Sequence, residues 1–248
     1  PEKTKALRSV WETENQKLAD AEASVEAALR PAFDAWIAGG MADAARSVWR
    51  LLEPTELKSN AKATFKPLGD GSYLVEGANG SHDTYTITIP VKPGPLTGLR
   101  LEALAHGSMN RKGPGRAGNG NFGLGKITLT VKPVTGEDRE VKIARAIADH
   151  EQNKGTLSVA ATLDEDPGSG WAVDGQIGRD HRAVFLFEEP LEIGADERLV
   201  IKLAFTVNTQ HNIGRLRLAA MSDGEPVLEG GVLVPDVEAA MERARGKD

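Results

Sequence analysis

Residues 84–91 read Thr-Tyr-Thr-Ile-Thr-Ile-Pro-Val, so every second side chain is aromatic or aliphatic. Side chains of a β-strand point alternately to its two faces, and a period of two therefore predicts a strand with one buried face. The same alternation recurs at residues 99–103, 127–131 and 199–207. Residues 183–187 are apolar almost throughout and predict a strand that is buried on both faces.

Turn-forming pairs such as Asp70-Gly71 and Asn79-Gly80 separate these strands. Residues 139–149 fit neither the helical nor the strand period cleanly, and their β-branched residues favour a strand. A series of about nine or ten strands without intervening helices predicts an antiparallel β-sandwich and not a Rossmann-type fold. We place this sandwich at residues 54–234.

The first 53 residues follow a helical period instead. One stripe of a first helix has a three-four spacing in which Glu14 is the only charge. Pro31 suits the first turn of a second helix that Gly39-Gly40 would end. A third helix is expected from Met41 to about Leu52, so that this segment forms a compact helical unit. The stripe of the first helix contains Leu7, Trp11, Glu14, Leu18, Ala21, Val25 and Ala28.

A short helix is also expected at residues 235–248, where Val237 and Met241 share one face. Helices then bracket the strands, which indicates a β module inserted into a larger, partly helical protein. The first residue, Pro1, is not a methionine, and no targeting pattern follows it. We therefore expect a piece of a longer chain.

Composition excludes several classes of function. The 30 Lys and Arg against 36 Asp and Glu leave a formal charge of −6, which argues against nucleic acid as the main partner. No run approaches the ~18 consecutive apolar residues of a membrane span. With no cysteine, the chain has no disulfide, no thiolate zinc site and no cysteine nucleophile.

No motif supports catalysis. Residues 118–123 fit the dinucleotide pattern G-x-G-x-x-G, but that motif requires a following helix, and a strand is expected here. The five histidines stand far apart, and no nucleophile-elbow pattern G-x-S-x-G occurs. We therefore expect a protein that is not an enzyme.

An acidic turn at residues 164–169 is a candidate metal site. Asp164, Asp166 and Ser169 supply two carboxylates and a hydroxyl, the hard oxygen ligands that Ca²⁺ prefers. The spacing does not fit an EF-hand, because Ser169 stands where its glycine is needed. An acidic surface turn without metal explains the same residues, and both interpretations stay open.

The stretch from Ala161 to Trp171 resembles the acidic turn of discoidin-like domains, which have a galactose-binding-like jelly roll that is common among carbohydrate-binding modules. The resemblance implies structural calcium held by Asp164, Asp166 and Ser169, with Trp171 as a core anchor. Glu165 replaces the usual glycine of that turn.

Four further stretches resemble a module of large planctomycete surface or periplasmic proteins that also carry cytochrome c-like domains, and they occur in the same order as in that module. The resemblance spans residues 49–222 and implies a binding module of a multidomain parent in the periplasm or at the cell surface. Lys126 departs from the pattern of that module, because it places a cation where the resemblance implies a calcium-binding Glu. The stretches are TGLRLEAL (97–104), GPGRAGNGNF (113–122), GWAVDGQIGRDHRAVF (170–185) and HNIGRLRLAAMS (211–222).

We expect polysaccharide as the ligand of such a module. Sugar sites combine an apolar platform with a few precise polar groups, and guanidinium groups pair with anionic sugars. The glycine-rich loop could instead fold onto the sheet with Arg116 satisfying carbonyls. The candidate ligand-binding residues are Arg111, Arg116, Asn119, Asn121, Tyr73 and His211.

Other interpretations remain open at this stage, among them a hydrolase, which would need two carboxylates about 5–9 Å apart in a groove. Arg215 and Arg217 alternate along a strand and either line a concave sheet face or point to solvent. The alternative to carbohydrate binding is a scaffold domain that docks neighbouring domains of its parent chain. Such a scaffold would hide its aromatic residues and expose an apolar patch.

Overall fold

The computed structural model describes residues 2–38, 49–222, 228 and 232–233. The chain divides into two units, residues 1–46 and 47–248, and each is described by itself. No helix among the described residues combines the length and the apolar character needed to cross a membrane.

The N-terminal unit contains one helix, α1 (Glu2–Ala38), of 37 residues. Ala, Glu, Lys, Arg and Gln are strong helix formers, and no glycine interrupts this stretch. The helix runs through Pro31, so the prediction of two helices separated there is wrong. Proline removes one backbone hydrogen bond, and the favourable propensity of its neighbours sustains the helix on both sides.

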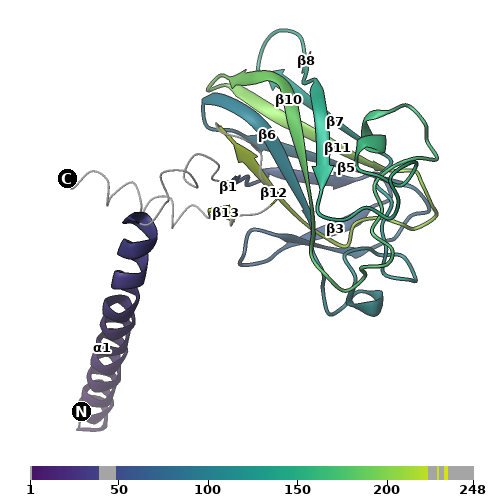
Figure 1. Ribbon diagram of the computed structural model, residues 1–248. Coiled ribbons are helices and arrows are strands. Elements are labelled where there is room, and N and C mark those ends of the chain that lie inside the picture. The colour runs from purple at the N-terminus through teal and green to yellow at the C-terminus, as the bar shows by residue number, and fades with distance from the viewer. Residues whose placement is uncertain (1, 39–48, 223–227, 229–231, 234–248) are drawn as a thin grey trace. The chain divides into compact units, whose positions relative to one another are not determined.

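The second unit is a sandwich of two sheets (Figure 1). All strand pairs are antiparallel except β1 with β13. The eight-stranded sheet contains β1 (Trp49–Leu51), β3 (Ala63–Pro67), β4 (Tyr73–Gly77), β6 (Gly94–Ala103), β9 (Ile143–Ala148), β10 (His181–Ile193), β12 (Arg215–Met221) and β13 (Val232–Leu233). The five-stranded sheet contains β2 (Glu56–Ser59), β5 (Asp83–Pro90), β7 (Lys126–Pro133), β8 (Arg139–Glu140) and β11 (Glu197–Phe205).

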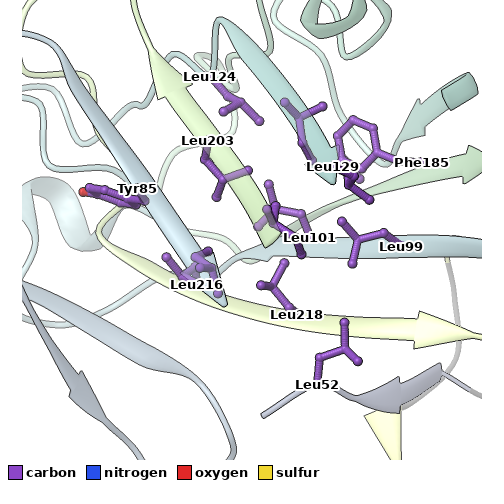
Figure 2. Close-up of a cluster of buried hydrophobic side chains, with 14 of the residues drawn as sticks. Leu52, Tyr85, Leu99, Leu101, Leu124, Leu129, Phe185, Leu203, Leu216 and Leu218 are labelled. Atoms are coloured by element: carbon purple, nitrogen blue, oxygen red, sulfur yellow. The ribbon is translucent and has the colours of Figure 1, made fainter. Parts of the chain in front are cut away.

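The core lies between the sheets and follows the alternation in the sequence (Figure 2). Tyr85, Ile87 and Ile89 of β5 are fully buried, and the threonines between them are half-buried. Leu99 and Leu101 come from the opposite sheet and complete the same cluster. The predicted fold class, an antiparallel β-sandwich with an N-terminal helix, is therefore confirmed.

The prediction of a third helix from Met41 to about Leu52 is wrong for residues 49–51, the part of that range with a described secondary-structure element. Residues 49–51 form β1, whose Arg50 and Leu51 pair with Ala220 and Ala219 of β12. Trp49 is fully buried in a second apolar cluster with Val184 and Met221. The predicted C-terminal helix at 235–248 lies outside the described residues.

Candidate functional site

Four loops gather at one end of the sandwich. They are residues 78–82, 104–125, 149–180 and 206–214, and strand pairing brings their ends together: Phe205 opposes Asp83, and Ala103 opposes both His181 and Leu216. Two of these loops are far longer than most connections between strands. Long ordered loops on a rigid scaffold commonly carry function, and this end is therefore the place for a candidate site.

The loops are joined by internal contacts. Leu124 and Trp171 exchange two backbone hydrogen bonds of 2.9 and 2.8 Å. The Phe122 and Trp171 rings meet edge to face with their centroids 4.9 Å apart. Both rings are fully buried, as predicted for Trp171 as a core anchor. The two long loops therefore share a small core of their own.

Asn121 lies in this small core between the two long loops and not at the exposed surface. Its side chain is 4% exposed, its Oδ1 accepts from the Val173 amide at 3.0 Å, and its Nδ2 donates to Gln152 Oε1 at 3.2 Å. Asn119 is exposed, and its Oδ1 accepts from the Asn121 amide at 3.0 Å. Of these two predicted ligand residues, only Asn119 faces solvent.

Arg116 ties the glycine-rich loop to the loop that follows β4. Its Nη1 donates to the Ala78 carbonyl at 2.6 Å and its Nη2 to the Gly77 carbonyl at 2.7 Å. The Asn79 amide group donates in return to the Arg116 carbonyl at 3.1 Å. The expectation that Arg116 satisfies carbonyls is confirmed.

We call these hydrogen bonds between Arg116 and residues 77–79 the Arg116 clamp. A groove of about 280 Å³ lies beside it. Its walls combine a carboxylate, amide groups, a hydroxyl and a guanidinium with a thioether and an aliphatic side chain. Planar polar groups of this kind donate to and accept from hydroxyl groups in fixed directions. The lining residues are Val75, Glu76, Asn79, Ser108, Met109, Asn110 and Arg116.

Two cations follow the groove residue Asn110 in the chain. Arg111 and Lys112 are exposed, and both adopt left-handed backbone conformations, with φ of 52° and 54°. Such conformations are uncommon for residues other than glycine and concentrate at functional sites. A tight turn holds them, since the Gly113 amide donates to the Asn110 carbonyl at 2.9 Å.

The remaining predicted ligand residues do not line this groove. Tyr73 opens β4 and is half-buried, and burial together with the charge of Glu53 raises the pKa of its hydroxyl. His211 is half-buried, with its Nδ1 2.8 Å from the Thr209 carbonyl. Arg116 is therefore the one predicted ligand residue that lines the groove. Arg111 does not line it but follows the groove residue Asn110 in the sequence.

The other groove residues could not be predicted from the sequence. Asn79 has only the pattern of a turn residue, and Ser108, Met109 and Asn110 follow no period that would single them out. The one available signal was the length of the loop that contains the last three, since long ordered loops often carry function.

Of the three predicted metal ligands in the acidic turn, Ser169 contacts the Asp164 carboxylate but meets Asp166 only at its backbone carbonyl, and the Asp166 carboxylate accepts from the Gly168 amide at 2.9 Å. Ser169 is buried, and its hydroxyl lies 2.7 Å from Asp164 Oδ1, 3.0 Å from the Asp166 carbonyl and 3.4 Å from the Ala161 carbonyl. One hydroxyl proton faces three oxygens, and the resulting all-oxygen set matches Ca²⁺ chemistry. It supplies only part of a shell of six to eight ligands.

The positive charge of Lys126 near the acidic turn disfavours the binding of a metal cation there. Lys126 forms an ion pair with Glu165, the residue between the two aspartates. The turn also uses its own carboxylates, since Asp164 Oδ1 accepts from the Asp166 amide at 2.9 Å. Within the described residues, no group of three or more His, Asp or Glu side chains is arranged to hold a metal ion.

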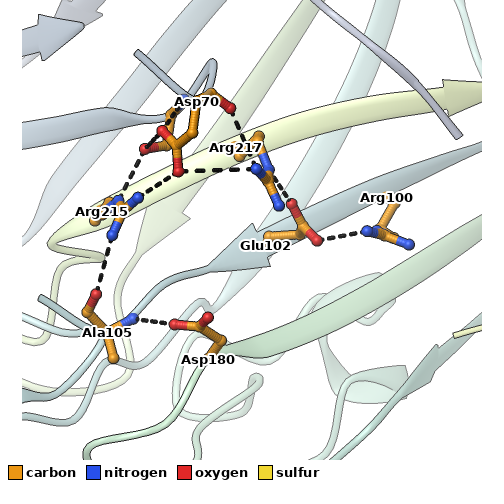
Figure 3. A network of polar contacts seen from close by, with 8 residues as sticks. Asp70, Arg100, Glu102, Ala105, Asp180, Arg215 and Arg217 are labelled. Atoms are coloured by element: carbon orange, nitrogen blue, oxygen red, sulfur yellow. Dashed lines mark hydrogen bonds and ion pairs between the residues drawn. The ribbon is translucent and has the colours of Figure 1, made fainter. Parts of the chain in front are cut away.

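Arg215 and Arg217 belong to a charged network on the outer face of the larger sheet (Figure 3). Arg217 pairs with Glu102, whose other oxygen accepts from buried Arg100 at 2.6 Å. Arg215 and Arg217 also contact Asp70, and only about a fifth of each of these two side chains is exposed. They are therefore neither simply solvated nor open to a ligand.

The charged network lowers the pKa of Asp70. Burial alone raises it, but hydrogen bonds from the Ser72 hydroxyl and amide and the charges of Arg215 and Arg217 outweigh burial, so the pKa lies below its ordinary value of 3.8. The carboxylate is the favoured form in the folded protein.

A second, more apolar groove of about 370 Å³ lies where β5 turns into β6. Its apolar wall includes Leu51, Leu52, Pro90, Val91 and Leu96. This groove is at the opposite end of β5 from the four loops and is a candidate surface for another protein segment.

No protein-family model matches the chain, and no curated protein matches its sequence. Among solved structures, a family 29 carbohydrate-binding module aligns with a TM-score of 0.28 and 11% identity over 71% of this chain and 86% of that chain. A family 35 module from an environmental isolate aligns with a TM-score of 0.31 and 10% identity over 71% and 98%. Another family 35 module, solved with a disaccharide that contains glucuronic acid, gives 0.28 and 14% over 69% and 99%.

Proposed function

We propose that the chain is a non-catalytic, galactose-binding-like module that binds polysaccharide at the loop groove. The observation that carries this proposal is the groove itself, whose lining includes Glu76, Ser108 and Asn110 together with the apolar Met109. Carboxylate, hydroxyl and amide groups match the mixed donor and acceptor character of sugar hydroxyls. Met109 supplies the apolar surface for a sugar ring.

The proposed ligand is an acidic polysaccharide. Arg111 and Lys112 add two positive charges next to Asn110, in a chain whose formal charge is −6. A guanidinium pairs with carboxylate or sulfate through two parallel hydrogen bonds. The uncommon backbone of both residues fixes where their side chains leave the loop, directly after the groove residue Asn110.

Affinity-gel electrophoresis tests the proposal. We expect gels that contain uronic-acid or sulfated polysaccharides to retard the protein, and Arg111→Ala/Lys112→Ala to abolish most of the retardation. The matched control is Arg198→Ala/Lys202→Ala, which removes two exposed cations from β11 in the smaller sheet. Equal retardation of both double variants, or none with any polysaccharide, overturns the proposal.

A scaffold role is the second candidate, in which the chain docks a neighbouring domain of its parent. In the described part of the β unit every aromatic ring is buried or half-buried, and the apolar groove beside Val91 is available to a protein segment. Val91→Asp should then abolish binding to the parent's other domains, expressed as separate chains. Unchanged binding contradicts this role.

Structural calcium at the acidic turn is a further proposal, supported by the oxygens around Ser169. A metal that binds only the folded state raises its stability by mass action, so chelator should lower the melting temperature. An unchanged melting temperature and no calcium in the purified protein would refute it.

The proposed parent is a multidomain protein of the periplasm or cell surface. This part of the proposal follows from the sequence resemblance, and fractionation of the producing cells tests it. Recovery of the parent only from the cytoplasm contradicts it.

A further inference from the structure

The apolar stripe of α1 is uncovered. From residue 4 to residue 31, every described side chain of the helix is exposed. Leu7, Trp11, Leu18 and Val25 are each 57–70% exposed. Helices in proteins gain most of their stability from packing an amphipathic face, so a stripe of this length indicates a partner.

The stripe has the period of a coiled coil. Its positions alternate in steps of four and three residues, which is a period of 3.5. A period of 3.5 keeps the same stripe facing one partner helix along the whole length of a supercoil. The positions of one series are Thr4, Trp11, Leu18 and Val25, and those of the other are Leu7, Glu14, Ala21 and Ala28.

We infer that α1 binds α1 of a second copy of the chain, in antiparallel orientation. A parallel pair in register would place Glu14 against Glu14 of the second copy inside the seam, where two like charges repel. The antiparallel pair places Glu14 against Leu18 instead. Lys17 already pairs with Glu14 at 2.8 Å within the helix and draws its charge to the edge of the seam.

Side-chain size fits the antiparallel pair. In this arrangement the large Trp11 faces the small Ala21 of the second copy, and Leu7 faces Val25. Alternating large and small residues fill a seam without voids. The two-fold symmetry repeats each contact at the other end of the pair.

Charge complementarity also favours this orientation. Residues 2–8 of α1 carry three cations and one acid, whereas residues 20–26 carry three acids and no cation. Arg8 also pairs with Glu12 at 3.1 Å within its own helix. The antiparallel pair sets the basic part of each helix beside the acidic part of the other. Arg8 and Glu22 of the second copy then flank the same interval of the seam.

Cysteine cross-linking tests the orientation, because the chain contains no cysteine of its own. Glu14→Cys and Leu18→Cys are prepared as separate variants of the full chain and then mixed. The antiparallel pair predicts a mixed disulfide between the two variants and little self-linking of Leu18→Cys. Self-linked Leu18→Cys as the main product, or no cross-link in any mixture, overturns the inference.

Sedimentation analysis of charge variants tests the partner. Arg8→Glu should weaken self-association about tenfold, and Arg8→Glu/Glu22→Arg should restore it. Lys5→Glu is the matched control, since it makes the same charge change in the same part of α1 but away from the seam. Circular dichroism checks that each variant keeps its helix. A monomeric parent chain, or equal weakening by Arg8→Glu and Lys5→Glu, refutes a second copy as the partner.

Discussion

Single glycines decide whether the loop end of the sandwich can form. The backbone at Gly115 lies so close to the next turn that a Cβ there would be 1.9 Å from the Asn121 carbonyl oxygen. Gly118, three residues later in the same loop, has no atom within 4 Å of such a Cβ. The first glycine is needed for a close backbone approach, and the second is not.

We expect Gly115→Ala to lower the free energy of unfolding by about 3 kcal/mol, because overpacking shifts the backbone. Gly118→Ala should cause no loss, since it only restricts the unfolded chain. Urea denaturation of the two variants checks this contrast. Equal midpoints would contradict the close approach at Gly115.

Arg116 is a second residue whose effect can be separated. Arg116→Ala leaves the Gly77 and Ala78 carbonyls without their charged donor. Both residues are exposed, so water can take the place of the guanidinium, and we expect a loss of about 1 kcal/mol of unfolding free energy. Arg111→Ala removes an exposed cation and should stay within about 0.5 kcal/mol. Urea denaturation again compares the pair. Unchanged stability of Arg116→Ala would show that the clamp does not stabilise the fold.

At the scale of the elements, the loop at 149–180 is fixed to β10 by Asp149. Its Oδ1 accepts from the Arg182 amide at 2.9 Å, and its Oδ2 lies 3.2 Å from Nδ1 of buried His181. Burial alone raises the pKa of Asp149, but these hydrogen bonds and the charge of His181 lower it below 3.8. The folded protein therefore favours the carboxylate more than the unfolded chain does.

The sign of the pH effect follows from linkage. With a lower pKa in the folded state, the unfolded chain binds more protons as pH falls, so the stabilisation is present above about pH 4 and is lost below it. Asp149→Asn should lower the unfolding free energy at pH 7 by about 1–2 kcal/mol and by much less at pH 3. Urea denaturation at both values measures it. A penalty that does not change between these pH values would contradict the pairing.

Long alternating stretches allowed most of the strands to be predicted. In residues 84–91 and 199–205 the period of two repeats several times, and the structure buries the expected side chains. β1 could not be predicted this way, because three residues are too short to show a period. Its strand conformation depends on pairing with Ala219 and Ala220, far away in the sequence.

The groove could not be predicted for a related reason. It forms between residues 75–79 and 108–116, and only the folded sheet brings these segments together. The sequence identified Arg116 and Arg111 by their charge, but it contains no local signal that separates a side chain in the interior, such as Asn121, from one at the surface.

At the scale of the whole molecule, the chain combines two units with different sources of stability. The core clusters among the described residues lie within residues 49–232 and are formed by strands and the loops between them. The described side chains of α1 are exposed. A helix of this kind depends on association, whereas the sandwich depends on its own core.

Two separate unfolding transitions are therefore expected. The helical circular dichroism signal should melt at a temperature that rises with protein concentration, because α1 is stabilised by pairing with a second copy. In a Trp11→Phe/Trp36→Phe variant, which keeps no tryptophan in α1, the near-ultraviolet signal of buried Trp49, Trp171 and Tyr85 should melt at a temperature that does not depend on concentration. Both probes are followed during heating at two concentrations tenfold apart. A single coincident transition at both concentrations would mean that α1 and the sandwich unfold as one unit, and the division of the chain into two independently stabilised parts would then be wrong.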